Sequence, residues 1–217
     1  MMTGMNTRLT RTVPSLLIAA LAGLALMNAS GDPGFGSGAE EAAMQATSTL
    51  LVDDFSGEQG TSAIGTEWRL FTDRVMGGVS DATSSLETIE GRRCLRLRGR
   101  VSLENNGGFI QVALPLTQGG RPFDASEFKG VRAWVRGNGK TYHIHLRTAQ
   151  TRLPWQYFSA AFDSTPIWRP VDLPFDGFKP ENLQAKLDTR GLERIAVVAI
   201  GKEFEADVAV SRLEFYR

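Results

Sequence analysis

Apolar and polar residues alternate with a period of two along most of the chain from residue 50 onward. The alternation is clear around residues 95–98, 110–116, 131–136, 142–147 and 212–216. A period of two places one side of a β-strand on a core and the other side toward solvent or a cleft. Residues 195–200 are apolar at every position, which predicts a central strand covered on both faces.

Turn residues separate these runs. Asn138-Gly139 joins two of them and predicts a two-residue hairpin, because both residues tolerate a positive φ. Asn106-Gly107-Gly108 predicts a second turn that leads into a strand from Phe109. A short helix is expected only near residues 181–187. The pattern therefore predicts an all-β domain over residues 50–217, a two-sheet β-sandwich of the jelly-roll type with about ten strands.

The amino-terminal region has a different character. Arg8 and Arg11 precede an apolar run over residues 13–27, and no acidic residue occurs before Asp32. This is the pattern of a secretory signal peptide, and the run is shorter than the roughly 20 residues of a membrane-spanning helix. We assign residues 1–29 to a signal peptide or an uncleaved membrane anchor and predict export to the periplasm or the cell exterior, with a mitochondrial presequence as the alternative. Residues 30–49, rich in Gly, Ala, Ser and Thr, predict a flexible linker.

Composition excludes several classes of function. The 24 basic and 24 acidic residues balance, so no net charge favours nucleic acid as a partner. The single cysteine, Cys94, excludes an intramolecular disulfide and a four-cysteine zinc site. The chain contains no GxSxG nucleophile motif, no P-loop, no Rossmann glycine fingerprint and no HExxH. We therefore predict a protein without catalytic residues and without a cofactor.

Two histidines form a candidate metal site. His143 and His145 are two residues apart on an expected strand, so both side chains project from one face and could share an ion. A third ligand would have to be a carboxylate from a neighbouring strand. The alternative is a polar outer face that Arg147 continues.

Aromatic residues on expected polar faces are candidates for binding. Trp134 stands between Arg132 and Arg136, and Trp155 and Tyr157 open another expected strand. Flat exposed rings can stack on sugar rings or anchor a protein partner. The two arginines could instead stack on Trp134 as a solvated ladder.

Residues 68–80 carry a more specific pattern. A Trp is followed by Asp-x-Val-Met-Gly-Gly-x-Ser, which resembles the signature of the complex I intermediate-associated protein 30 family. Further similar pieces follow in the same order as in the family, among them Asp53-Asp54-Phe55, Gly107-Gly108-Phe109 and Trp155-Gln156. The resemblance runs from about Val52 to the carboxyl end.

The resemblance implies a galactose-binding-like jelly roll, which agrees with the strand pattern. It also implies a non-catalytic role, since mitochondrial members are assembly factors for NADH:ubiquinone oxidoreductase. The exported amino terminus departs from that role. We therefore expect a module that binds a protein partner, as an assembly or chaperone-like factor. The alternative is an exported carbohydrate-binding module, followed by a metal-dependent enzyme that uses the two histidines.

The signature itself has two interpretations. In the structural one, Gly77 and Gly78 allow a sharp turn or close approach, Asp73 and Ser80 bond nearby backbone, and Met76 fills an apolar gap above Trp68. In the other, the loop is an edge that presents residues to a partner. The candidate binding residues are Trp68, Asp73, Met76, Gly77, Gly78, Ser80, Trp134, Trp155 and Tyr157.

Overall fold

A computed structural model describes residues 49–57 and 60–217. The leader expected at residues 1–29 and nearly all of the expected linker lie outside these residues. Within the described ranges the chain forms two six-stranded antiparallel sheets and short 3₁₀ turns, without an α-helix. None of these elements could cross a membrane as a helix.

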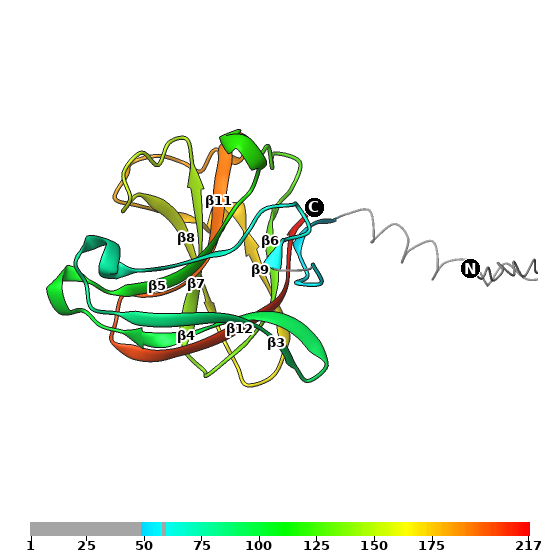
Figure 1. The fold of residues 1–217 in the computed structure, drawn as a ribbon. Coiled ribbons are helices and arrows are strands. Elements are labelled where there is room, and N and C mark those ends of the chain that lie inside the picture. Colours follow the sequence, from blue (N-terminus) through cyan, green and yellow to red (C-terminus); the bar gives the residue numbers. More distant parts are fainter. Residues whose placement is uncertain (1–48, 58–59) are drawn as a thin grey trace, which may run out of the picture. The chain divides into compact units, whose positions relative to one another are not determined.

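The two sheets stack face to face (Figure 1). Sheet I has the order β3-β4-β12-β6-β9, with β1 also paired to β12. Its strands are β1 (Thr49–Asp53), β3 (Asp81–Ile89), β4 (Arg92–Val101), β6 (Gly130–Gly137), β9 (Arg169–Pro174) and β12 (Phe204–Tyr216). Sheet II has the order β10-β8-β7-β11-β5-β2. Its strands are β2 (Arg69–Thr72), β5 (Phe109–Pro115), β7 (Thr141–Thr148), β8 (Tyr157–Asp163), β10 (Lys179–Glu181) and β11 (Leu192–Ile200). The predicted all-β sandwich is confirmed.

The core lies between the sheets and follows the period of two. Val131, Ala133 and Val135 of β6 and Ile144 and Leu146 of β7 are fully buried in one cluster that both sheets share. Strand β11 lies between β7 and β5, as its continuous apolar run predicted. Its residues alternate between this main core and a small second cluster on the outer face of sheet II.

The predicted hairpin at Asn138-Gly139 is wrong, because β6 and β7 belong to different sheets. The Asn138 N–H donates to the carbonyl of Asp207 at 3.1 Å, and its side-chain amide donates to the carbonyl of Glu205 at 2.7 Å. These bonds fix the turn against β12. The chain passes from sheet I to sheet II at this turn. The two-residue hairpin joins β3 to β4 at Glu90-Gly91, whose φ values of 51° and 76° suit a type I′ turn.

The turn at residues 106–108 is confirmed, and β5 begins at Phe109. The helix expected near residues 181–187 is wrong. That segment is irregular, and Leu183, Ala185 and Leu187 pack against the core from it. Their spacing of two suits extended chain, since a helix would spread the three side chains around its circumference.

Asp73, at the start of the short turn η2 (Asp73–Met76), joins two loops. Its carboxylate is fully buried. It accepts from the N–H of Ser80 at 3.0 Å, the N–H of Gly108 at 2.6 Å and the N–H of Phe109 at 3.3 Å, and also from the Ser80 hydroxyl. The side chain therefore holds the loop of residues 73–80 against the turn before β5. The backbone bonds that the sequence suggested for Asp73 and Ser80 are present.

Two glycines make room for this carboxylate. A Cβ on Gly78 would lie 2.4 Å from the carboxylate carbon of Asp73, and a Cβ on Gly107 would lie 2.5 Å from its Oδ2. Gly77 instead forms the turn, with a φ of 92° that residues with a side chain rarely adopt. The glycine pair of the signature thus serves one close approach and one sharp turn.

We predict that Asp73→Asn lowers the free energy of unfolding by about 3 kcal/mol, because an amide cannot accept all of these buried donors. Urea denaturation of the purified domain measures this loss. Asp176→Asn, at an exposed aspartate, is the matched control and should change stability little. Equal stability of the two variants would contradict a central role for Asp73.

The contribution of Asp73 to the free energy of unfolding should depend on pH. Burial, the largest influence, raises its pKa, but the hydrogen bonds from Ser80, Gly108 and Phe109 together outweigh burial and lower the pKa below the ordinary value. A lowered pKa in the folded state stabilises the protein fully above the ordinary value of about 4. We expect the stability difference between wild type and Asp73→Asn to shrink as pH falls from about 4 through the lowered pKa. Unfolding curves at a series of pH values test this, and a difference that grows on acidification would disprove it.

Candidate binding groove

The outer face of sheet II has small residues at its centre. Ala196 and Val198 of β11 form the floor, the rings of Phe71 and Phe109 lie beside it, and Ala113 of β5 belongs to the same small cluster. Small side chains flanked by large ones leave a hollow, here with a volume of about 620 Å³. We call it the apolar hollow.

Residues outside the strands form the walls of the apolar hollow. Val75 and Met76 come from the signature loop, and Leu103 comes from the segment after β4. Trp155, just before β8, closes another side with 49% of its surface exposed. Val75 is 71% exposed, and Met76 and Leu103 are each 47% exposed. Solvent-exposed apolar side chains therefore surround this hollow.

His145 and Tyr157 add a stacked pair to the lining. Their rings are 3.9 Å apart between centroids and inclined by 12°. His145 is 6% exposed, and within the described chain its Nε2 has no hydrogen-bond partner. Burial, with a smaller contribution from His143, lowers the pKa of His145 to about 3. The ring is therefore neutral at physiological pH and holds a buried polar nitrogen that a ligand could satisfy.

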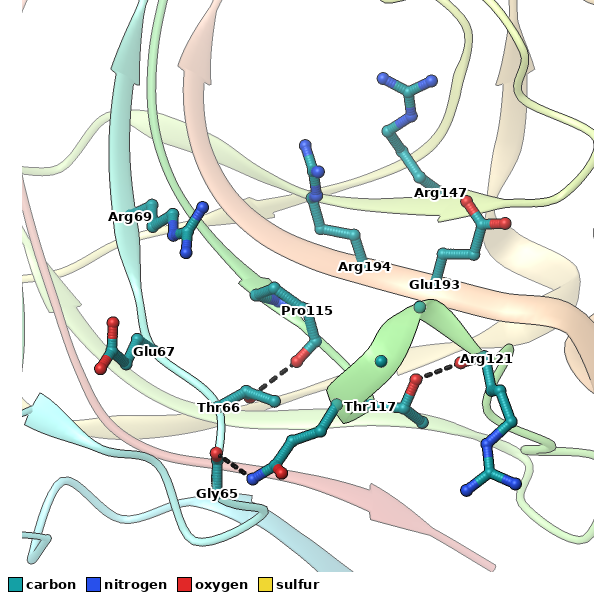
Figure 2. A pocket seen from close by; sticks show the side chains of 13 residues that line it. Gly65, Thr66, Glu67, Arg69, Pro115, Thr117, Arg121, Arg147, Glu193 and Arg194 are labelled. Atoms are coloured by element: carbon teal, nitrogen blue, oxygen red, sulfur yellow. Dashed lines mark hydrogen bonds between the residues drawn. The ribbon is translucent and has the colours of Figure 1, made fainter.

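A second hollow of about 700 Å³ adjoins the first at the carboxyl end of β5, and Figure 2 shows its lining. Arg147 and Arg194 line both hollows, and Arg69 lines the second. The three side chains come from β7, β11 and β2 (Figure 2). We call this the basic hollow, and the two hollows together the binding groove.

Loop contacts frame the basic hollow. The Gln118 side chain donates to the carbonyl of Gly65 at 2.7 Å, and the Thr66 hydroxyl donates to the carbonyl of Pro115 at 2.7 Å (Figure 2). These bonds tie the segment before β2 to the loop after β5. The end of the groove is therefore bounded by fixed backbone.

The histidine pair does not gain a third ligand. His143 Nδ1 lies 2.9 Å from the Ser159 hydroxyl, and no cluster of three or more His, Cys, Asp or Glu side chains is suited to a metal within residues 49–57 and 60–217. Cys94 is fully buried in sheet I, and burial raises the pKa of its thiol. A buried thiol with a raised pKa is a poor nucleophile.

The structure brings some of the candidate residues together and separates others. Met76, Trp155 and Tyr157 line the apolar hollow. Asp73, Gly77, Gly78 and Ser80 lie in the loop that carries Met76, with Asp73 and Ser80 buried. Trp134 lies on β6 of sheet I, away from the groove.

Trp68 has a structural contact. Its Nε1 donates to the Asp53 carboxylate at 2.7 Å, and its ring packs at a tilt on Phe55 at 5.9 Å. The expectation that Met76 fills an apolar gap is wrong, because 47% of its surface is exposed at the groove.

Sequence reasoning missed the arginines and two phenylalanines of the groove. Phe71 lies within the signature segment and Phe109 follows a predicted turn, so both had a local signal. Arg69, Arg147 and Arg194 are far apart in sequence, and only the strand order of sheet II brings them together.

Solved structures that are similar to this fold include carbohydrate-binding modules. A family 11 module from Clostridium thermocellum, in complex with a β-1,3-1,4-mixed-linked tetrasaccharide, has a TM-score of 0.60 at 11% identity, covering 78% of this chain and 95% of that one. The family 11 module of the cellulosomal cellulase Lic26A-Cel5E of the same organism has a TM-score of 0.58 at 11% identity, covering 77% and 94%. At this identity the likeness establishes the shared fold. No curated protein sequence matches the chain.

The sequence also matches a family model, described as Complex I intermediate-associated protein 30 (CIA30), over residues 54–206. This range contains the signature loop, the Asp73 contacts and the whole floor of the groove. The resemblance read from residues 68–80 is confirmed, and the chain belongs to the complex I intermediate-associated protein 30 family.

Proposed function

We propose that this domain is a non-catalytic binding module whose ligand is a glycan held in the binding groove. The observation that carries the proposal is the lining of the apolar hollow, where half-exposed Trp155 and the stacked Tyr157–His145 pair stand beside an apolar floor. Sugar rings have apolar faces that pack on such aromatic groups, and their hydroxyls need polar partners at the margin.

Polar groups stand where those hydroxyls would lie. Gln111, Asn182 and Asn106 line the hollow together with the Nε2 of His145, which has no hydrogen-bond partner among the described residues. A hydroxyl can donate to or accept from a neutral imidazole, which would satisfy that buried nitrogen. The volume of about 620 Å³ also suits a ligand of a few sugar rings rather than a small ion.

Export would fit this ligand. The leader expected at residues 1–29 would deliver the domain to a compartment where extracellular polysaccharides occur. The carbohydrate-binding modules that share the fold support the proposal without identifying the glycan.

We expect Trp155→Ala to weaken glycan binding about tenfold or more, because the exposed ring would lose its stacking on the sugar. A glycan array finds the ligand, and calorimetric titration measures the affinity. Trp134→Ala is the matched control, since Trp134 lies on the opposite sheet. The proposal fails if no glycan binds, or if both variants bind as tightly as the wild type.

A protein partner is the second candidate, favoured by the apolar rim. Val75, Met76 and Leu103 expose apolar surface in one place, which is typical of a protein interaction site. Family membership supports this candidate, and an assembly role would be one form of it.

For this candidate we expect Val75→Asp to reduce cross-linking of the full chain to a partner severalfold, because a charge would replace the exposed apolar contact. Ile167→Asp is the matched control, since Ile167 is 69% exposed and does not line the groove. Quantitative cross-linking in the native host is the measurement. Equal capture by both variants would exclude the rim as the interface.

A further inference from the structure

Two arginines face each other in the middle of the binding groove. Arg147 of β7 and Arg194 of β11 are directly opposite in the strand register. Like charges at such a position destabilise a sheet. Burial and the neighbouring Arg194 charge both lower the pKa of Arg147, while Glu193 opposes them. The protein therefore holds two repelling cations side by side.

No acidic side chain in the described part of the chain forms an ion pair with these arginines. In the described part of the chain, no carboxylate is within ion-pairing distance of Arg69, Arg147 or Arg194, although Glu67 and Glu193 also line the basic hollow. Backbone and an aromatic ring hold the guanidinium groups instead. Arg147 donates to the carbonyls of Thr151 at 2.6 Å and Leu153 at 3.1 Å, and Arg194 lies over the Phe71 ring at 5.9 Å.

Arginines on the outer face of sheet I have a different environment. Arg96 contacts Glu87 at 3.1 Å and Asp207 at 2.6 Å, and Arg132 contacts Asp172 at 2.6 Å. Several arginines of sheet I thus form ion pairs, whereas the three arginines of the groove form none within the described residues. An anionic ligand would supply the missing charge.

Resting on the proposed function, we infer that the glycan is anionic and that the basic hollow holds its carboxylate or sulfate group between Arg147 and Arg194, with Arg69 beside them. Guanidinium groups bind both kinds of anion through paired N–H donors. The uncharged sugar faces then pack on Trp155 and Tyr157 in the adjoining apolar hollow. Because Arg147 and Arg194 line both hollows, one short oligosaccharide can reach both.

The test compares three probes by calorimetric titration with the whole domain. One is an oligogalacturonate, the second is the same oligosaccharide with its carboxyl groups reduced to alcohols, and the third is a sulfated galactan oligosaccharide. We expect at least one anionic probe to bind about tenfold more tightly than the reduced one, and this preference to weaken with added salt. The anionic probe that binds more tightly distinguishes carboxylate from sulfate.

Two variants test whether the groove causes the preference for the anionic probe. Arg194→Gln should lose the roughly tenfold preference for the anion, whereas Arg92→Gln, an exposed arginine of sheet I, should keep it. The melting temperature of Arg194→Gln should equal or exceed that of the wild type, because the substitution removes the repulsion with Arg147. If Arg194 had only a structural role, its substitution would lower the melting temperature.

Two failures can be told apart. If the anionic and reduced probes bind equally and Trp155→Ala weakens both, the anion inference is overturned and the glycan function stands. If neither the three probes nor any other glycan binds, both the anion inference and the proposed glycan function are overturned. Unchanged anion preference in Arg194→Gln would also overturn the inference.

Discussion

The buried carboxylate of Asp73 accepts hydrogen bonds from two loops that are separate in sequence, and the wall of the binding groove depends on this contact. Without those bonds, the N–H groups of Ser80, Gly108 and Phe109 would be buried without an acceptor. Positions 78 and 107 require glycine because any Cβ there would collide with the carboxylate. The most specific part of the family signature is therefore explained by packing around one anion.

The same loop also has an exposed tip. Asp73 and Ser80 are buried at its base, while Val75 and Met76 are exposed beside the apolar hollow. The two interpretations of the signature are compatible for this reason: the buried residues fix the loop, and the fixed loop presents its apolar tip. A rigid base lowers the entropy that the loop would lose when a ligand binds.

The two sheets use their outer faces differently. On sheet I, charged side chains of opposite sign pair across the strands and fill the surface. On sheet II, small apolar residues form a floor with aromatic rings around it, and the arginines at one end form no ion pair within the described residues. An unfilled surface with uncompensated charge costs stability, and binding a ligand there would recover part of that cost.

The sequence alone determined the all-β class, the strand periodicity, the central strand at residues 195–200 and the family, because alternation, turn residues and a short signature are local patterns. It also placed Met76, Trp155 and Tyr157 among the binding candidates. Only the tertiary structure decided that the Asn138-Gly139 turn crosses between sheets, since its anchors lie on β12, far away in the chain. The groove depended on the tertiary structure for the same reason. Arg69, Arg147 and Arg194 come from three strands whose order in the sheet differs from their order in the sequence, so no local pattern could bring them together.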